Sequence, residues 1–215
     1  HNAEVWLNGQ KAAFRPYGYT NFYVDCAPYL HAGENELRVI ARNADQPNSR
    51  WYSGAGIYRP VQLWTARSAH IALNGVKIPA IVEVRVKTTA PGTVRLTMDD
   101  LPAMQQENDG EAVFTLTLDN ASLWTPETPN LYTCRVNFAD DVVTETFGVR
   151  KVEWGTDGFL LNGKRYIIQG ACIHHDNGLL GAVCDPDAVA RKVRLLKENG
   201  YNAIRSAHNP CSKAL

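Results

Sequence analysis

Three histidines and one arginine are the residues of this sequence whose types and positions best suit chemistry. His174 and His175 follow one short apolar run, and Arg205 and His208 lie at the end of another. Imidazole donates and accepts hydrogen bonds and titrates near neutral pH, and guanidinium binds carboxylates. If the two runs are neighbouring strands, these side chains form a candidate ligand-binding site. The alternative is that they are solvated loop residues or helix-capping partners.

Two other kinds of site fit these residues less well. The histidines lack the short H-x-x-x-H or H-x-H spacing that places two metal ligands on one element, so we expect no metal here. Cys172 and Cys211 lie near the histidines in the sequence. A Cys–His nucleophile pair would need an activating partner for the thiolate, and the sequence offers none.

The pattern around these residues predicts a strand, a helix and a second strand. The first strand is expected at Tyr166–Ile168, followed by a turn at Gly170, and the second at Asn202–Ser206. Between them, Asp185 is the expected N-cap, and Pro186 the first helical residue. Gly200 is the expected C-terminal stop, and apolar residues at helical spacing predict one stripe: Val189, Val193 and Leu196.

A strand–helix–strand unit with a crossover of this length joins two parallel strands with right-handed topology. The carboxyl ends of parallel strands meet at one edge of the sheet, where ligands commonly bind. We therefore expect His174, His175, Arg205 and His208 to converge on one face.

Composition excludes several classes of partner. The chain has 215 residues, with 22 basic and 22 acidic side chains, so charge favours neither nucleic acid nor an anionic membrane surface. No apolar run approaches the roughly 20 residues that cross a bilayer. Five scattered cysteines without a C-x-x-C pair argue against a zinc site or a disulfide framework. They suit a reducing compartment, although a bacterial periplasm stays open, and no signal peptide is visible.

Residues 1–67 are predicted to form a β domain of short strands. Asn8-Gly9 is a strong hairpin signal, and apolar alternation predicts further strands around Phe22–Val24 and Val61–Leu63. The long loop between residues 44 and 60 has side chains that suit sugar recognition: Asp45, Arg50, Trp51 and Tyr52. The simpler interpretation is a loop that Trp51 packs against another domain.

Residues 68–150 are predicted to form an immunoglobulin-like β sandwich, because short alternating strands recur at regular intervals. Residues 151–215 begin with a hairpin that turns at Asn162-Gly163 and continue into the strand–helix–strand unit. A complete (β/α)₈ barrel takes about 250 residues. We therefore expect the start of a barrel, a chain cut at both ends, and exposed apolar surface that favours self-association.

Four stretches together resemble glycoside hydrolase family 2, most closely its bacterial β-galactosidase branch. They are SRWYSGAGIYRPV (49–61), LWTPETPNLY (123–132), FLLNGKRYIIQGACIHHD (159–176) and NAIRSAHNP (202–210). The resemblance implies a multidomain, mainly-β chain. It would consist of part of a jelly-roll domain, an immunoglobulin-like domain and the first βα units of a TIM barrel.

The resemblance also implies roles for individual residues. His174 would line the sugar subsite, His208 would bond the glycone, and Arg205 would support the nucleophilic carboxylate. Asp45 would be an acid by which the jelly-roll domain reaches the site. The sequence departs from the family pattern at Asn209, where many members have tyrosine, and at Cys211, where proline is common.

The function implied is a retaining, exo-acting β-galactosidase. Such enzymes need two carboxylates about 5–5.5 Å apart, and in the family both are glutamates on later barrel strands. We therefore expect no catalytic residue in this segment and no activity from it alone. The sister alternatives are β-glucuronidase and β-mannosidase, and the alternative from another class is a non-catalytic carbohydrate-binding module.

The resemblance finally implies a partner, an oligomeric state, a location and possible metal ions for the whole protein. The expected partner is a β-galactoside or a related saccharide, with neither nucleic acid nor a membrane involved. The full-length enzyme is expected to be a homo-oligomer of the bacterial cytoplasm or periplasm. It could use Mg²⁺ or Na⁺ near the active site, with ligands that lie mostly outside this segment.

Overall fold

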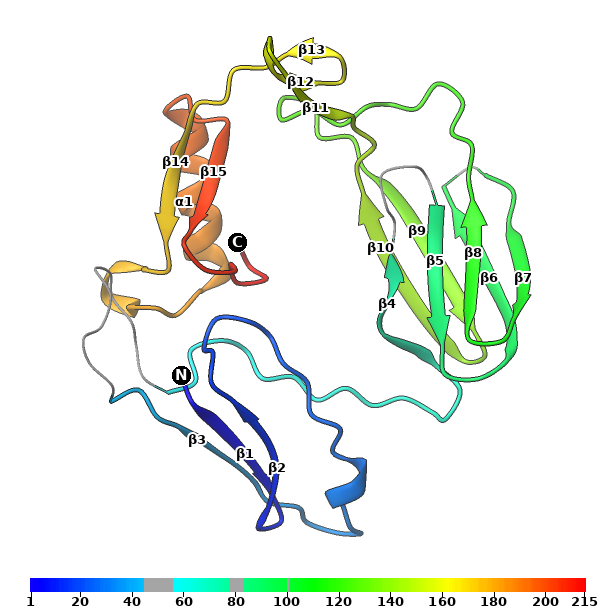
Figure 1. Cartoon of the computed structure of the whole chain (residues 1–215), viewed down its shortest axis with the longest axis vertical. Helices are drawn as coiled ribbons and strands as arrows, with labels where there is room; N and C mark the ends of the chain where they lie inside the picture. The colour runs from blue at the N-terminus through cyan, green and yellow to red at the C-terminus, as the bar shows by residue number, and fades with distance from the viewer. Residues whose placement is uncertain (45–55, 78–82, 100) are drawn as a thin grey trace. The chain divides into compact units, whose positions relative to one another are not determined.

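The structure, a computed structural model, describes residues 1–44, 56–77, 83–99 and 101–215 (Figure 1). These residues form 15 strands, one α helix and two short 3-10 helices, so the predicted mainly-β fold is confirmed. Four residues of the predicted sugar-binding loop lie outside the described residues: Asp45, Arg50, Trp51 and Tyr52. The chain divides into two compact units, His1–Gln62 with Ile168–Leu215, and Leu63–Ile167. The domain bounds expected at residues 67 and 150 stay predictions.

The first unit begins with a three-stranded sheet in the order β2-β1-β3. Its strands are β1 (Ala3–Leu7), β2 (Gln10–Arg15) and β3 (Leu37–Ala41). The predicted hairpin is confirmed, since Asn8 and Gly9 both have positive φ, 49° and 78°, as a tight two-residue turn requires. Val5 and Leu7, on either side of the half-buried Trp6, are buried.

The strands predicted around Phe22–Val24 and Val61–Leu63 are wrong. Both segments are irregular, and Tyr23, Val61 and Leu63 are more than half exposed. Alternation of apolar residues favours a strand only where a neighbouring strand completes the hydrogen-bond ladder. Neither segment has such a neighbour among the described residues.

The second part of this unit is a parallel strand–helix–strand element, as predicted. Its elements are β14 (Gly170–His174), α1 (Pro186–Glu198) and β15 (Ala203–Ala207). The Asp185 side chain accepts a hydrogen bond from the backbone N–H of Ala188 at 3.0 Å, and Gly200 has a φ of 84°. Both helix boundaries are therefore where the capping signals placed them. Of the apolar stripe, Val189 is buried and Val193 is 37% exposed.

The first strand of this element begins later than predicted. Tyr166–Ile168 is not part of β14, and Ile167 and Ile168 are more than half exposed. The strand starts instead at Gly170, which pairs with Ala203. A Cβ on Gly170 would lie 2.9 Å from the Ala203 carbonyl oxygen, so the absent side chain allows this close pairing. The expectation of exposed apolar surface in this region is confirmed, and self-association stays a prediction.

The second unit contains a two-sheet sandwich, labelled in Figure 1. One sheet has the order β4-β5-β8, with β4 (Ile71–Lys77), β5 (Glu83–Thr88) and β8 (Glu111–Thr115). The other has the order β10-β9-β6-β7, with β6 (Gly92–Met98), β7 (Met104–Asn108), β9 (Tyr132–Phe138) and β10 (Asp141–Phe147).

Alternating residues from both sheets form the core of this sandwich. The most deeply buried are Val84, Val86, Val94, Leu96, Cys134 and Val136. Burial raises the pKa of the Cys134 thiol to about 11, so this cysteine stays protonated and packs as a small apolar residue.

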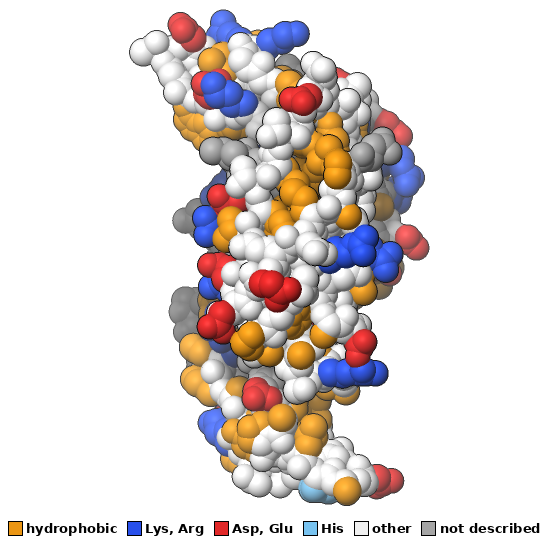
Figure 2. All heavy atoms as spheres, turned by 90° about the vertical axis from the view of Figure 1, so that its right-hand side faces the viewer, with side chains coloured by type: hydrophobic (Ala, Val, Ile, Leu, Met, Phe, Trp, Pro, Cys, Tyr) orange, Lys and Arg blue, Asp and Glu red, His pale blue; other side chains and the backbone are white. Residues whose placement is uncertain are grey.

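On the face shown in Figure 2, Lys and Arg side chains are interspersed with Asp and Glu side chains and gather into no patch of one sign.

The predicted hairpin follows the sandwich within the same unit. It consists of β11 (Val152–Gly155), β12 (Gly158–Leu161) and the short β13 (Lys164–Arg165). Asn162 and Gly163 have positive φ, 53° and 76°, as predicted for its turn. The Asn162 amide donates to the Trp124 carbonyl at 3.1 Å, and Trp124 N–H donates to Val149 at 2.8 Å. These bonds fix the Trp124 backbone against the start of the hairpin.

We predict that Gly148→Ala destabilises this unit. A Cβ on Gly148 would lie 2.7 to 2.8 Å from three atoms of the Trp124 side chain, whose backbone is fixed. The free energy of unfolding is expected to fall by about 1–3 kcal/mol, measured by urea denaturation. Gly155→Ala is the matched control, because a Cβ there meets no heavy atom within 4 Å. Equal effects of the two substitutions would contradict the packing argument.

Candidate functional site at the ends of β14 and β15

The parallel pairing of β14 with β15 brings three of the four predicted residues together. Cys172 pairs with Arg205 and His174 pairs with Ala207, so both strands end at the same level. The peptide bond that follows, between Ala207 and His208, is cis. The rings of His174 and His208 lie edge to face, 5.4 Å apart between centroids.

Arg205 fixes the protonation pattern of His208. Its guanidinium contacts Nδ1 of His208 through a hydrogen bond, and lies 3.7 Å from the Cys172 sulfur. A guanidinium can only donate, so Nδ1 must accept and carries no proton. In this arrangement Nε2 of His208 carries the ring proton and is a hydrogen-bond donor. Both side chains are exposed at the strand ends.

His175 differs from the other three residues in being buried, although its imidazole bonds the backbone of Asn209, the residue after His208. His175 follows the end of β14 in a bend, where the Asp176 N–H donates to the His174 carbonyl at 2.9 Å. His175 is 5% exposed and stacks obliquely on Tyr19, with ring centroids 5.6 Å apart. Burial lowers the pKa of His175, and the Arg59 cation lowers it further, although a hydrogen bond to the Asn209 backbone opposes both effects. The imidazole is therefore neutral near pH 7.

Arg59 joins the N-terminal segment to the turn that follows His208. One guanidinium nitrogen donates to the Tyr19 carbonyl at 2.7 Å, and the other donates to the Pro210 carbonyl at 2.8 Å. Its cation also lies over the Tyr58 ring, 5.2 Å from the centroid. The Tyr58 hydroxyl donates to the Gly18 carbonyl at 2.8 Å, and burial raises its pKa. We call this set of contacts the Arg59 joint.

Sequence reasoning missed the residues of this joint. Tyr58 and Arg59 lie in the quoted stretch SRWYSGAGIYRPV, which indicated the family but gave no role to either. The aromatic stretch RPYGYTNFY, residues 15–23, held a signal that went unused: three tyrosines directly after a strand. Aromatic residues crowded into a loop often pack against another segment.

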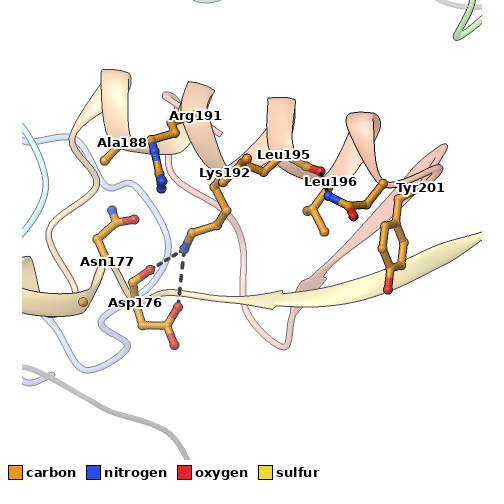
Figure 3. A pocket seen from close by; sticks show the side chains of 10 residues that line it. Asp176, Asn177, Ala188, Arg191, Lys192, Leu195, Leu196 and Tyr201 are labelled. Carbon is orange, nitrogen blue, oxygen red and sulfur yellow. Dashed lines mark hydrogen bonds and ion pairs between the residues drawn. The ribbon is translucent and has the colours of Figure 1, made fainter.

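A separate hollow of about 780 Å³ lies against α1, as Figure 3 shows. Its lining includes Asp176, Lys192 and Tyr201, and none of the three clustered residues. The Lys192 ammonium contacts both the carbonyl and the carboxylate of Asp176, the latter at 3.4 Å. Asp176 is thus engaged away from the cluster, and Asp185 caps the helix. These two acids do not provide a carboxylate pair at the strand ends.

The described ranges contain neither a group of metal-ligating side chains nor a helix that could span a membrane. Within them, no three His, Cys, Asp or Glu side chains are grouped to hold a metal ion. None of their helices has the length and apolar character needed to span a bilayer. Asp45, the remaining predicted binding residue, falls in the range 45–55 that the structure does not describe, so its role stays a prediction.

Two family profiles match this chain. Residues 71–150 match "Glycosyl hydrolases family 2", and residues 152–215 match "Glycosyl hydrolases family 2, TIM barrel domain". The chain belongs to glycosyl hydrolase family 2. The resemblance to family 2 is confirmed, and so is the fold class, whereas the closer likeness to the β-galactosidase branch stays a prediction.

Relatives within family 2 carry different activities in their names. A β-galactosidase from Bacteroides ovatus is 38% identical over 97% of this chain, which covers 28% of that protein. A family 2 member from Bacteroides cellulosilyticus has a TM-score of 0.84 at 32% identity, over 100% of this chain and 34% of its own. A β-glucuronidase from Faecalibacterium prausnitzii has a TM-score of 0.80 at 30% identity, over 99% of this chain and 43% of its own. The chain thus spans less than half the length of each.

We predict that Arg59→Lys weakens the joint. A lysine has one compact ammonium and cannot donate to the Tyr19 and Pro210 carbonyls along two fixed directions. The melting temperature is expected to drop, corresponding to a loss of about 1–3 kcal/mol in unfolding free energy. Arg194→Lys, at an exposed position of α1, is the matched control and is expected to stay within about 0.5 kcal/mol. A loss at Arg194 as large as that at Arg59 would refute the assignment.

We also predict that acid destabilises the first unit through His175. The pKa of His175 is lowered in the folded state from its ordinary value of about 6.5, so the unfolded chain takes up this proton more readily. The free energy of unfolding is therefore expected to decrease as the pH falls below about 6.5. Thermal melts across this range are expected to show a weaker pH dependence for His175→Gln. His31→Gln, at an exposed histidine, is expected to leave the dependence unchanged.

Proposed function

We propose that the protein containing this chain is a retaining, exo-acting β-glycosidase that hydrolyses terminal β-D-galactosides. The observation that carries this proposal is the cluster of His174, Arg205 and His208 at the carboxyl ends of two parallel strands in a family 2 chain. Ligands of barrel enzymes bind at this edge of the strands. The similarity to a named β-galactosidase supports the same assignment.

In this proposal the described residues bind and orient the substrate. The Nε2–H of His208 donates to a sugar hydroxyl, and His174 lines the same subsite. The guanidinium of Arg205 has donors beyond the one that His208 accepts, and these orient the carboxylate nucleophile. Double displacement needs a nucleophile and an acid/base, both carboxylates. We assign both to glutamates outside this chain, so the chain alone is expected to be inactive.

We choose a neutral sugar over a uronic acid for this proposal. A uronate needs a cation with unused donors near the glycone. The terminal nitrogens of Arg59 donate to backbone carbonyls, and Lys192 pairs with Asp176. Arg205 bonds His208 and keeps unused donors, which the proposal assigns to the carboxylate nucleophile. That assignment favours a galactoside over a glucuronide, and we retain glucuronide and mannoside as the alternatives to be tested.

The test is a substrate panel on the whole protein, combined with a change at His208. We expect hydrolysis of 4-nitrophenyl β-galactoside in preference to the β-glucuronide and the β-mannoside. His208→Ala is expected to lower kcat/KM about 100-fold or more, as loss of a donor to the reacting sugar does. His31→Ala, far from the cluster in sequence and exposed, is the control for a general effect of removing an imidazole. Preference for the glucuronide, or full activity of His208→Ala, would overturn the proposal.

A further inference from the structure

A phenol from the N-terminal segment meets an amide beside the candidate site. The Tyr17 hydroxyl lies 2.6 Å from Oδ1 of Asn209, although 191 residues separate them along the chain. Asn209 directly follows His208 in the chain, so this bond ties the N-terminal segment to the residue next to the histidine that we assign to the sugar. Tyr17 is 39% exposed, and its hydrogen bond to Asn209 lies at the surface.

The direction of this hydrogen bond determines what the pair presents. An amide oxygen can only accept, so the Tyr17 hydroxyl must donate its single proton to Asn209. The phenol oxygen then has lone pairs to offer, and the Asn209 Nδ2 has two N–H groups. Within the described part of the chain, no other hydrogen-bond partner is found for either side chain. The pair thus presents an acceptor and a donor side by side.

Contacts with neighbouring residues hold both Tyr17 and Asn209 in place. The Tyr17 ring lies 5.7 Å from the Tyr19 ring, which stacks on His175. The Asn209 carbonyl accepts from the Ser206 hydroxyl at 2.7 Å, and the next carbonyl, that of Pro210, accepts from Arg59. Groups that are held in place before binding lose little entropy when a ligand arrives, which makes them effective in discrimination.

We propose that Tyr17 and Asn209 form a specificity-determining pair that binds a hydroxyl group of the sugar next to His208. A sugar hydroxyl both donates and accepts, so it complements an adjacent acceptor and donor. The N-terminal segment thereby supplies part of the binding site for a substrate held mainly by the barrel strands. This inference rests on the proposed function and assigns to Tyr17 the recognition of a sugar hydroxyl.

The test compares Tyr17→Phe with the parent on aryl β-galactosides that each lack one hydroxyl. Tyr17→Phe removes the hydroxyl and keeps the ring that packs on Tyr19. In the whole protein, kcat/KM for the complete substrate is expected to fall about tenfold or more. For the one analogue that lacks the contacted hydroxyl, Tyr17→Phe is expected to change kcat/KM less than threefold, because the contact is already missing. Asn209→Asp, which keeps the acceptor for Tyr17 and removes the amide donors, is expected to lose discrimination at the same hydroxyl.

Tyr29→Phe, which removes a phenol elsewhere in the same unit, is the matched control and is expected to leave all rates unchanged. An equal loss for Tyr17→Phe on every analogue would show a structural role and overturn the inference, as would no loss at all. Calorimetric binding of a phenyl thio-β-galactoside separates this inference from the proposed function. A protein that binds this ligand in a Tyr17-dependent manner without hydrolysing any glycoside would uphold the pair and overturn the hydrolase. Absence of both binding and hydrolysis would overturn both.

Discussion

The parallel pairing of β14 with β15 is the constraint on which the candidate site depends. Antiparallel pairing would send the ends of the two strands to opposite edges, whereas the parallel register aligns His174 with Ala207 and places His208 directly beyond it. The pairing itself depends on Gly170, whose missing Cβ lets the strand approach Ala203. A glycine in a strand usually weakens it. Here it allows the close pairing with Ala203 at which the strand begins.

The candidate site also depends on the Arg59 joint, which connects the N-terminal segment to the turn after β15. Two charge-assisted hydrogen bonds from Arg59 and a tilted ring pair of Tyr19 and His175 form this contact. Guanidinium is the side chain suited to this task, because its donors are rigid and point in fixed directions. The joint holds the Pro210 carbonyl, next to Asn209, whose side chain accepts from Tyr17 and which directly follows His208 in the chain. Under the proposal for Tyr17, this one region serves both stability and specificity.

Family membership and local geometry support different parts of the functional assignment. The family profiles identify a glycosyl hydrolase chain, while named relatives include both a β-galactosidase and a β-glucuronidase. The choice between a neutral and an acidic sugar therefore rests on charge at the site. In the described ranges, Arg59, Lys192 and Arg205 each bond a protein group, and our proposal of a neutral sugar rests on the roles assigned to these three cations.

The sequence by itself determined the features that local chemistry controls, and the tertiary structure decided those that need a distant partner. Helix boundaries at Asp185 and Gly200 and the turns at Asn8-Gly9 and Asn162-Gly163 depend on φ preferences and caps, so their residue types sufficed. The cluster of His174, Arg205 and His208 followed from the strand–helix–strand pattern and the handedness of its crossover. The start of β14 did not, because an apolar run at Tyr166–Ile168 says nothing about which backbone pairs with it. The contacts of Tyr17, Tyr19 and Arg59 lay beyond any local rule, since folding alone brings the ends of the chain together.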